Sequence, residues 1–197
     1  CNFSIEKGSN GCYIYHDNDR NLQITSCSFL NKIQSPNNDK FAIYSESKEF
    51  TFESNIVEFK NPSKNNLVFN LKSSKWIQIE NCEFINCINQ DQPGFRFDGQ
   101  TEKSTTNIVD CDFKSTKSAS FLVKITGGVS NINSCYMNHC SLKMEYAGTA
   151  SIKRCITSNC DSIQVNYAPN DLRIKEEEAL IPFEISDNVY ENEDIVN

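Results

Sequence analysis

The sequence is organised around one short motif that recurs along most of its length. Residues 79–84 show it best, with Ile79 followed three positions later by Cys82 and five positions later by Phe84. The cysteine position recurs 20 to 29 residues apart, with asparagine in one copy, at Cys1, Cys27, Asn55, Cys82, Cys111, Cys135 and Cys155. A motif repeated at this period is typical of solenoids, whose units bury a core only by stacking on their neighbours.

The spacing inside each copy predicts the shape of the unit. Apolar and polar residues alternate on either side of the motif, as in Phe121-x-Val123-x-Ile125, and this period of two predicts strands. Ile79 and Cys82 are three positions apart, an odd step that a straight strand cannot place on one face. A two-residue corner at Glu80-Asn81 would let both point inward. Each repeat then holds three short strands, which make one rung of a parallel β-helix.

This pattern resembles the repeat of the right-handed parallel β-helix of the pectate-lyase-like superfold. That family often has an inward asparagine at the corner, which Asn55 keeps and cysteine replaces elsewhere. The resemblance covers residues 1–167 and implies an all-β, right-handed parallel β-helix (solenoid) of about seven coils, with three short strands per coil. Residues 168–197 are expected to form an irregular acidic tail, either a cap on the last coil or a linker.

The net charge of −7 comes from this tail. Residues 168–197 contain nine acids and two bases, which leaves 17 acids and 17 bases in residues 1–167. A body with balanced charge offers no basic stripe, so a nucleic acid partner is not expected. No run approaches the roughly 18 apolar residues of a membrane span, so no membrane span is expected in this segment either.

Ten cysteines leave three interpretations open. Three pairs share the spacing Cys-x4-Cys, namely Cys82/Cys87, Cys135/Cys140 and Cys155/Cys160. They could form a buried ladder of reduced thiols that act as small hydrophobes, disulfides between stacked coils, or metal ligands. Zinc sites more often use the spacing Cys-x2-Cys, and an inward ladder position makes a poor zinc cage.

Carboxylates on the outward side of the corner are the candidates for chemistry. Alignment of the repeats places Glu80, Glu83, Asp110 and Asp112 on adjacent coils, with Glu83 above Asp112. Like charges this close repel one another unless a cation compensates, so these four residues are candidate ligands for a cation such as Ca²⁺. The alternative interpretation is a solvated acidic surface.

The resemblance also implies an enzymatic hypothesis. Pectate-lyase-like enzymes combine carboxylates and calcium with a basic arginine, which makes Asp112 and Arg154 the candidate catalytic residues. The lyase segments with clustered Asp, and the hydrolase motifs Asn-Thr-Asp, Asp-Asp and Gly-His-Gly, are absent. His16 and His139 have no evident nucleophile beside them, so no catalytic triad is predicted.

Three functional classes follow from these observations. The first is a non-catalytic β-solenoid module, an adhesive or scaffolding segment of a larger cell-surface protein. Its protein or glycan partner would bind the projecting loops at residues 30–40 and 88–94. The second is a polysaccharide lyase or hydrolase that uses the acidic face, and the third is an intracellular structural subunit. An extracellular or cell-surface location fits the first class, while a cytoplasmic one fits the third.

Overall fold

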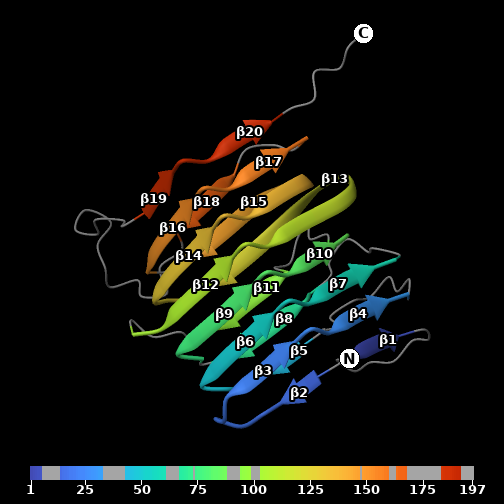
Figure 1. Cartoon of the computed structure of the whole chain (residues 1–197). Helices are drawn as coiled ribbons and strands as arrows, with labels where there is room; N and C mark the ends of the chain where they lie inside the picture. The colour runs from blue at the N-terminus through green and yellow to red at the C-terminus, as the bar shows by residue number, and fades with distance from the viewer. Residues whose placement is uncertain are drawn as a thin grey trace.

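The computed structural model describes residues 1–5, 14–32, 43–60, 67–72, 74–87, 94–98, 103–146, 148–159, 163–167 and 183–191. Every regular element in these residues is a strand, and every strand pairing is parallel. Figure 1 shows the strands stacked from the N-terminal end to the C-terminal end in the order of the sequence. The predicted all-β parallel solenoid is confirmed.

The strands line three faces of the solenoid. The first face contains β2 (Ile14–His16), β5 (Ile43–Ser45), β8 (Phe69–Lys72), β11 (Phe95–Asp98), the second halves of β13 (Asp112–Ile125) and β15 (Tyr136–Tyr146), and β18 (Gln164–Tyr167). The second face is the seven-stranded sheet of β3 (Leu22–Thr25), β6 (Glu49–Glu53), β9 (Trp76–Glu80), β12 (Thr105–Val109), β14 (Val129–Asn133), β16 (Thr149–Lys153) and β19 (Phe183–Ser186). The third face contains β1 (Asn2–Ile5), β4 (Ser28–Asn31), β7 (Ile56–Phe59), β10 (Glu83–Ile85), the first halves of β13 and β15, β17 (Ile156–Ser158) and β20 (Val189–Glu191).

The coils differ in how their strands are divided. About four turns, from β2 to the beginning of β13, consist of three separate strands each, whereas about seven such coils were predicted. Beyond that point β13 and β15 are 14 and 11 residues long, and each continues from the third face into the first face. The prediction of three short strands per coil is therefore wrong for the coils that contain β13 and β15, whereas β16 (Thr149–Lys153), β17 (Ile156–Ser158) and β18 (Gln164–Tyr167) are again separate short strands. A register shift between Lys114 and Ala119 takes up the bend in β13.

A single left-handed residue makes the corner between the second and third faces. The residues with positive φ at this corner are Ser26, Ser54, Asn81, Asp110, Ser134, Arg154 and Asp187. Glu80 remains in β9 and only Asn81, with φ of 52°, turns the chain, so the predicted two-residue corner is one residue too long. One left-handed residue suffices because it changes the direction of the chain and restores the inward orientation of the next side chain.

The inward residues form a continuous core. The predicted inward residues at the ends of the second-face strands are at most 6% exposed: Ile24, Phe52, Ile79, Ile108, Ile132 and Ile152. Phenylalanines fill the space between the faces, as where Phe84 stacks on Phe113 with ring centroids 5.1 Å apart. Phe95 meets Phe121 edge to face at 4.6 Å. Such contacts between coils replace the core that a single coil is too thin to form.

The solenoid extends further along the chain than residue 167. β19 pairs with β16 and β20 pairs with β17, so residues 183–191 add a strand to the second and third faces. They contain a copy of the motif, Ile185-x-x-Asn188-x-Tyr190, 33 positions after the copy at Cys155. The boundary predicted at residue 167 is thereby corrected. The prediction of a cap or a linker then applies only to residues 168–182 and 192–197, which lie outside the described residues.

None of the described residues forms a helix, and so this part of the chain contains no helix that could cross a membrane.

Candidate functional site

The structure brings two of the four predicted cation ligands together. Glu83 on β10 pairs in register with Asp112 on β13, as the repeat alignment predicted. Lys114, two residues further along β13, lies between them, with its Nζ 2.7 Å from Glu83 Oε1 and 3.0 Å from Asp112 Oδ2. Hydrogen bonds to Glu83 and then Asp112 raise the pKa of Lys114. The chain itself thus supplies a cation for this carboxylate pair.

The other two candidates lie beside this cluster. Glu80 ends β9, where its Oε2 accepts a hydrogen bond of 2.9 Å from Gln78 Nε2. Asp110 is the left-handed corner residue of its coil, with φ of 51°. A shallow groove of about 360 Å³ runs along this corner and is lined by Ser54, Asn55, Ile56, Asn81, Cys82, Glu83, Asp110 and Asp112. Within the described ranges, no three His, Cys, Asp or Glu side chains are arranged to hold a metal ion.

The two candidate catalytic residues do not meet. Asp112 begins β13, whereas Arg154 is the corner residue two coils further along, with the Ser134 corner between them. Arg154 Nε donates a hydrogen bond of 3.0 Å to Asn133 Oδ1. The described side chains thus give Asp112 and Arg154 different partners, Lys114 and Asn133.

The motif cysteines follow the left-handed corner residue, and we call Cys27, Cys82, Cys111, Cys135 and Cys155 the corner cysteines. The last four are at most 3% exposed. Each thiol donates to the carbonyl two residues earlier, as from Cys111 Sγ to Val109 O at 3.2 Å. Hydrogen bonds to Cys135 and Cys82, together with burial, raise the pKa of Cys111 well above its usual value.

The second cysteine of the Cys-x4-Cys pairs marks a second corner, between the third and first faces. Cys87 follows the left-handed Asn86, and Cys140 follows the left-handed His139. Both thiols are at most 5% exposed, and burial raises the pKa of Cys87 well above its usual value. The eight described cysteines carry free thiols, and Cys12 and Cys160 lie outside the described residues.

His16 has a neighbour that the sequence did not reveal. Ser45 Oγ on β5 lies 3.4 Å from His16 Nδ1 on the paired strand β2. Ser45 is 0% exposed, and its hydroxyl donates to Ser47 Oγ at 2.8 Å. A hydroxyl in this position stabilises the turn between the first and second faces and has no access to a substrate.

A polar row on the outside of the first face was not predicted as a site. The register places the following outward residues side by side on successive coils: Tyr15, Tyr44, Asn70, Arg96, Lys124 and Glu145. The exposed Tyr15 stacks on Tyr44 with ring centroids 4.8 Å apart, and Lys72 Nζ lies 5.2 Å from the centre of the Tyr44 ring. We call the six residues that lie side by side, from Tyr15 to Glu145, the first-face row.

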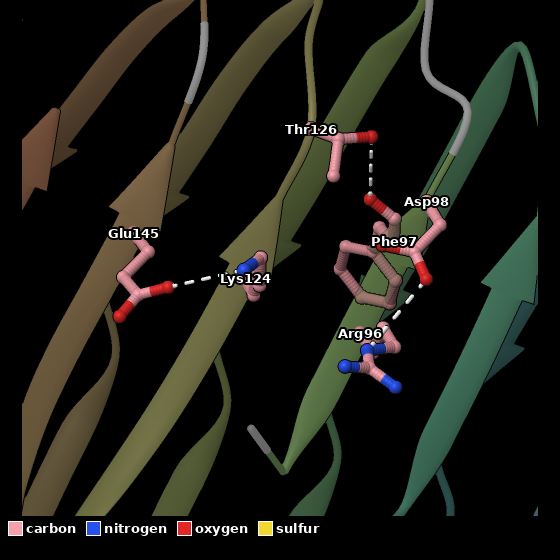
Figure 2. A network of polar contacts seen from close by, with 6 residues as sticks. All are labelled: Arg96, Phe97, Asp98, Lys124, Thr126 and Glu145. Carbon is pink, nitrogen blue, oxygen red and sulfur yellow. Dashed lines mark hydrogen bonds and ion pairs between the residues drawn. The ribbon is translucent and has the colours of Figure 1, made fainter. Parts of the chain in front are cut away.

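Ion pairs hold the charged part of the first-face row. Figure 2 shows Arg96 beside Asp98 on β11 and Lys124 beside Glu145 on the next two strands. The nitrogen–oxygen distances are 3.6 Å for Arg96–Asp98 and 3.5 Å for Lys124–Glu145. Side-chain period and coil register together could have revealed this row, but the variable turns hide the register in the sequence.

The projecting loops proposed for partner binding at residues 30–40 and 88–94 lie largely outside the described residues. Comparison of the chain with protein-family models, with curated proteins and with solved structures finds no match. The solenoid is therefore established by the geometry of the strands, and the pectate-lyase-like type remains a resemblance.

Proposed function

We propose that this chain is a non-catalytic β-solenoid module, an adhesive or scaffolding segment of a larger cell-surface protein. The observation that carries the proposal is the pairing of the outward charges. Lys114 occupies the space between Glu83 and Asp112, and Arg154 is bonded to Asn133. A lyase needs its carboxylates open to a cation and its base near the substrate. Charged side chains that are already paired with one another fit a surface that contacts a partner better than they fit a lyase active site.

The first-face row supplies a contact surface for this function. Tyr15 is 65% exposed and is held by stacking on Tyr44. A rigid tyrosine buries area at a low cost in conformational entropy, which favours its use in recognition. The neighbouring ion pairs, Arg96–Asp98 and Lys124–Glu145, add polar groups that are already oriented.

The enzyme alternative can be tested directly. We expect the purified chain to leave polygalacturonate intact with or without calcium, and Asp112→Ala and Arg154→Ala to change nothing. Depolymerisation that requires calcium and is lost in both variants would replace the proposed function with the polysaccharide-lyase alternative.

The adhesive function is tested by binding. The chain is applied to arrays of neutral and acidic oligosaccharides and of extracellular matrix proteins, and compared with its Tyr15→Ala and Trp76→Ala variants. Trp76 is the matched control, since it is 45% exposed but lies on the second face. We expect a bound probe to lose affinity at least about tenfold in Tyr15→Ala only. Equal loss in both variants, or binding to no probe, argues against this surface.

The state of the cysteines favours a second candidate. All eight described cysteines are free thiols, which is usual in a reducing compartment and unusual in a secreted protein. An intracellular structural subunit is therefore the second proposed function. Counting thiols in the denatured, unreduced protein distinguishes the two: ten free thiols in protein isolated from its source support the intracellular subunit, and fewer support the surface module.

A further inference from the structure

Four of the corner cysteines form an uninterrupted column of sulfur. The residues directly after Cys82, Cys111, Cys135 and Cys155 pair in register, as Glu83 with Asp112, Asp112 with Tyr136, and Tyr136 with Ile156. The cysteines themselves therefore lie on consecutive coils, about 4.8 Å apart along the solenoid axis. We call these four residues the thiol column.

The neighbours of each thiol in the column are other thiols and main-chain oxygens. Neighbouring thiols of the column shift one another's pKa, Cys82 with Cys111, Cys111 with Cys135, and Cys135 with Cys155. Each thiol also lies near a carbonyl of the preceding coil, such as Cys82 Sγ at 3.3 Å from Phe52 O. A dry row of sulfur ligands selects soft metal ions over hard ones.

The shape of the column decides the coordination number. A point between two coils has one sulfur above it and one below it, whereas a structural zinc site needs four ligands around one point. The described part of the chain has no group of three or more metal-ligating side chains, here or elsewhere. The thiol column therefore suits an ion that accepts two sulfur ligands on opposite sides. Among biological metals, monovalent copper combines this geometry with a preference for thiolates.

The corner groove reaches the thiol column at its first member. Cys82, the first thiol of the column, lines the groove together with Glu83, Asp110 and Asp112. Lys114 pairs with both Glu83 and Asp112, so these two carboxylates and Asp110 leave a net negative charge at the groove, which raises the local concentration of cations. The acidic surface therefore adjoins the first thiol of the column, because both lie at the same corner of the repeat.

We propose that the thiol column binds Cu(I) between adjacent coils, one ion between Cys82 and Cys111 and a second between Cys135 and Cys155. Each Cu⁺ replaces the proton of one thiol in its pair, which leaves as H⁺, and the second thiol binds through a sulfur lone pair. The S–Cu–S(H) unit is neutral, so no net charge is buried, and neither sulfur nor copper is oxidised.

The test is an anaerobic competition for Cu(I) with bicinchoninate. The parent protein carries Cys1→Ser, Cys12→Ser and Cys160→Ser, which remove the exposed thiol and the two outside the described residues. We expect it to withdraw two Cu(I) per chain from the chelator. Adding Cys111→Ser and Cys135→Ser leaves Cys82 and Cys155 with two sulfur-free coils between them, and we expect binding to disappear.

The matched control is Cys87→Ser, which removes a buried thiol at the other corner. Cys140 is the nearest described thiol at that corner and lies two coils away, so both Cu(I) ions should remain bound. Two ions retained by the Cys111→Ser/Cys135→Ser protein would overturn the proposal. X-ray absorption of the Cu(I)-loaded parent gives a second test that does not depend on the folding of the Cys111→Ser/Cys135→Ser protein. Two sulfur neighbours per copper support the column, and three or more, or nitrogen and oxygen neighbours, contradict it.

Discussion

Asparagine and cysteine occupy the same corner position of the repeat but satisfy the main chain in different ways. Asn55 Oδ1 accepts the N–H of Cys27 at 2.8 Å, and its Nδ2 donates to Ile24 O at 2.9 Å. Asn188 makes the same two bonds to Cys155 and Ile152. A corner cysteine offers one thiol in place of the amide. The asparagines and the four corner cysteines from Cys82 to Cys155 thus fasten their coils to the preceding ones.

We expect Asn55→Ala to lower the free energy of unfolding by about 2–4 kcal/mol, because it leaves a buried N–H and a buried carbonyl without their partner. Asn55→Cys is the matched control and should cost less, since cysteine is native at this position in neighbouring coils. Urea denaturation followed by circular dichroism measures both. Equal losses for the two variants would show that the amide bonds contribute little.

The pKa of Tyr44 gives a second prediction at this scale. Its hydroxyl donates to Glu46 Oε1, and this hydrogen bond, with burial and the charge of Glu46, raises the pKa from 10.0 to about 12. The protonated phenol is favoured in the folded state, so its stabilisation is present below pH 10 and is lost as the pH rises through about 12.

Absorbance titration of tyrosinate, with Tyr44→Phe as the reference that identifies the signal, measures this pKa. We expect Glu46→Gln to bring the pKa of Tyr44 down towards 10, because it removes both the carboxylate acceptor and the negative charge. An unchanged titration in Glu46→Gln would contradict the assigned cause.

At the scale of the elements, the left-handed corner residue lets two residues that are three positions apart, such as Ile79 and Cys82, both point into the core. Left-handed φ angles are costly for residues other than Gly, Asn and Asp, yet serine occupies this place at Ser26, Ser54 and Ser134. The hydrogen bonds between coils compensate, as from Ser26 N to Glu53 O at 3.1 Å.

We expect Ser26→Val to lower the free energy of unfolding by about 1–2 kcal/mol, because a β-branched residue is strained at φ of 53°. Ser26→Gly should be neutral or stabilising by up to about 1 kcal/mol, because glycine adopts this conformation without steric cost. Thermal unfolding of the two variants measures the difference. A Val variant as stable as the Gly variant would mean that the corner does not hold its left-handed conformation in solution.

The strands could be predicted from the sequence where the alternation of apolar and polar side chains shows which residues point inward. The motif placed Ile79, Cys82 and Phe84 in the core, and all three are at most 3% exposed. The same period would also have placed Lys114 on the side of Asp112, two residues away, where it pairs with Glu83 and Asp112, two of the predicted cation ligands. The first-face row needed the register between coils, which depends on turns of variable length.

At the scale of the whole molecule, strand pairing joins each described coil to its neighbours along the axis. The last described coil, which was predicted to be part of the tail, covers Ile152 and Cys155, and both are 0% exposed. Its motif lies 33 residues beyond the preceding one, outside the spacing of 20 to 29 that identified the other copies. A longer connection concealed it.

We expect deletion of residues 183–197 to lower the free energy of unfolding by about 3 kcal/mol or more, because it exposes the apolar edge of β16 and β17. Asn188→Ala is the matched control, which removes two hydrogen bonds and keeps the coil, and it should cost about half as much. Urea denaturation compares them. A deletion no more harmful than the point variant would mean that this coil adds little to the solenoid.

The long strands β13 and β15 have a mechanical consequence. They pair over ten residue positions around a corner, whereas neighbouring strands elsewhere pair over three to five. A molecule pulled by its two ends is expected to peel coil by coil, since the strand pairing of the described residues joins each coil to the next. The pairing of β13 with β15 resists such peeling most. Under load, the coils on either side of this pair are therefore expected to separate before β13 and β15 do.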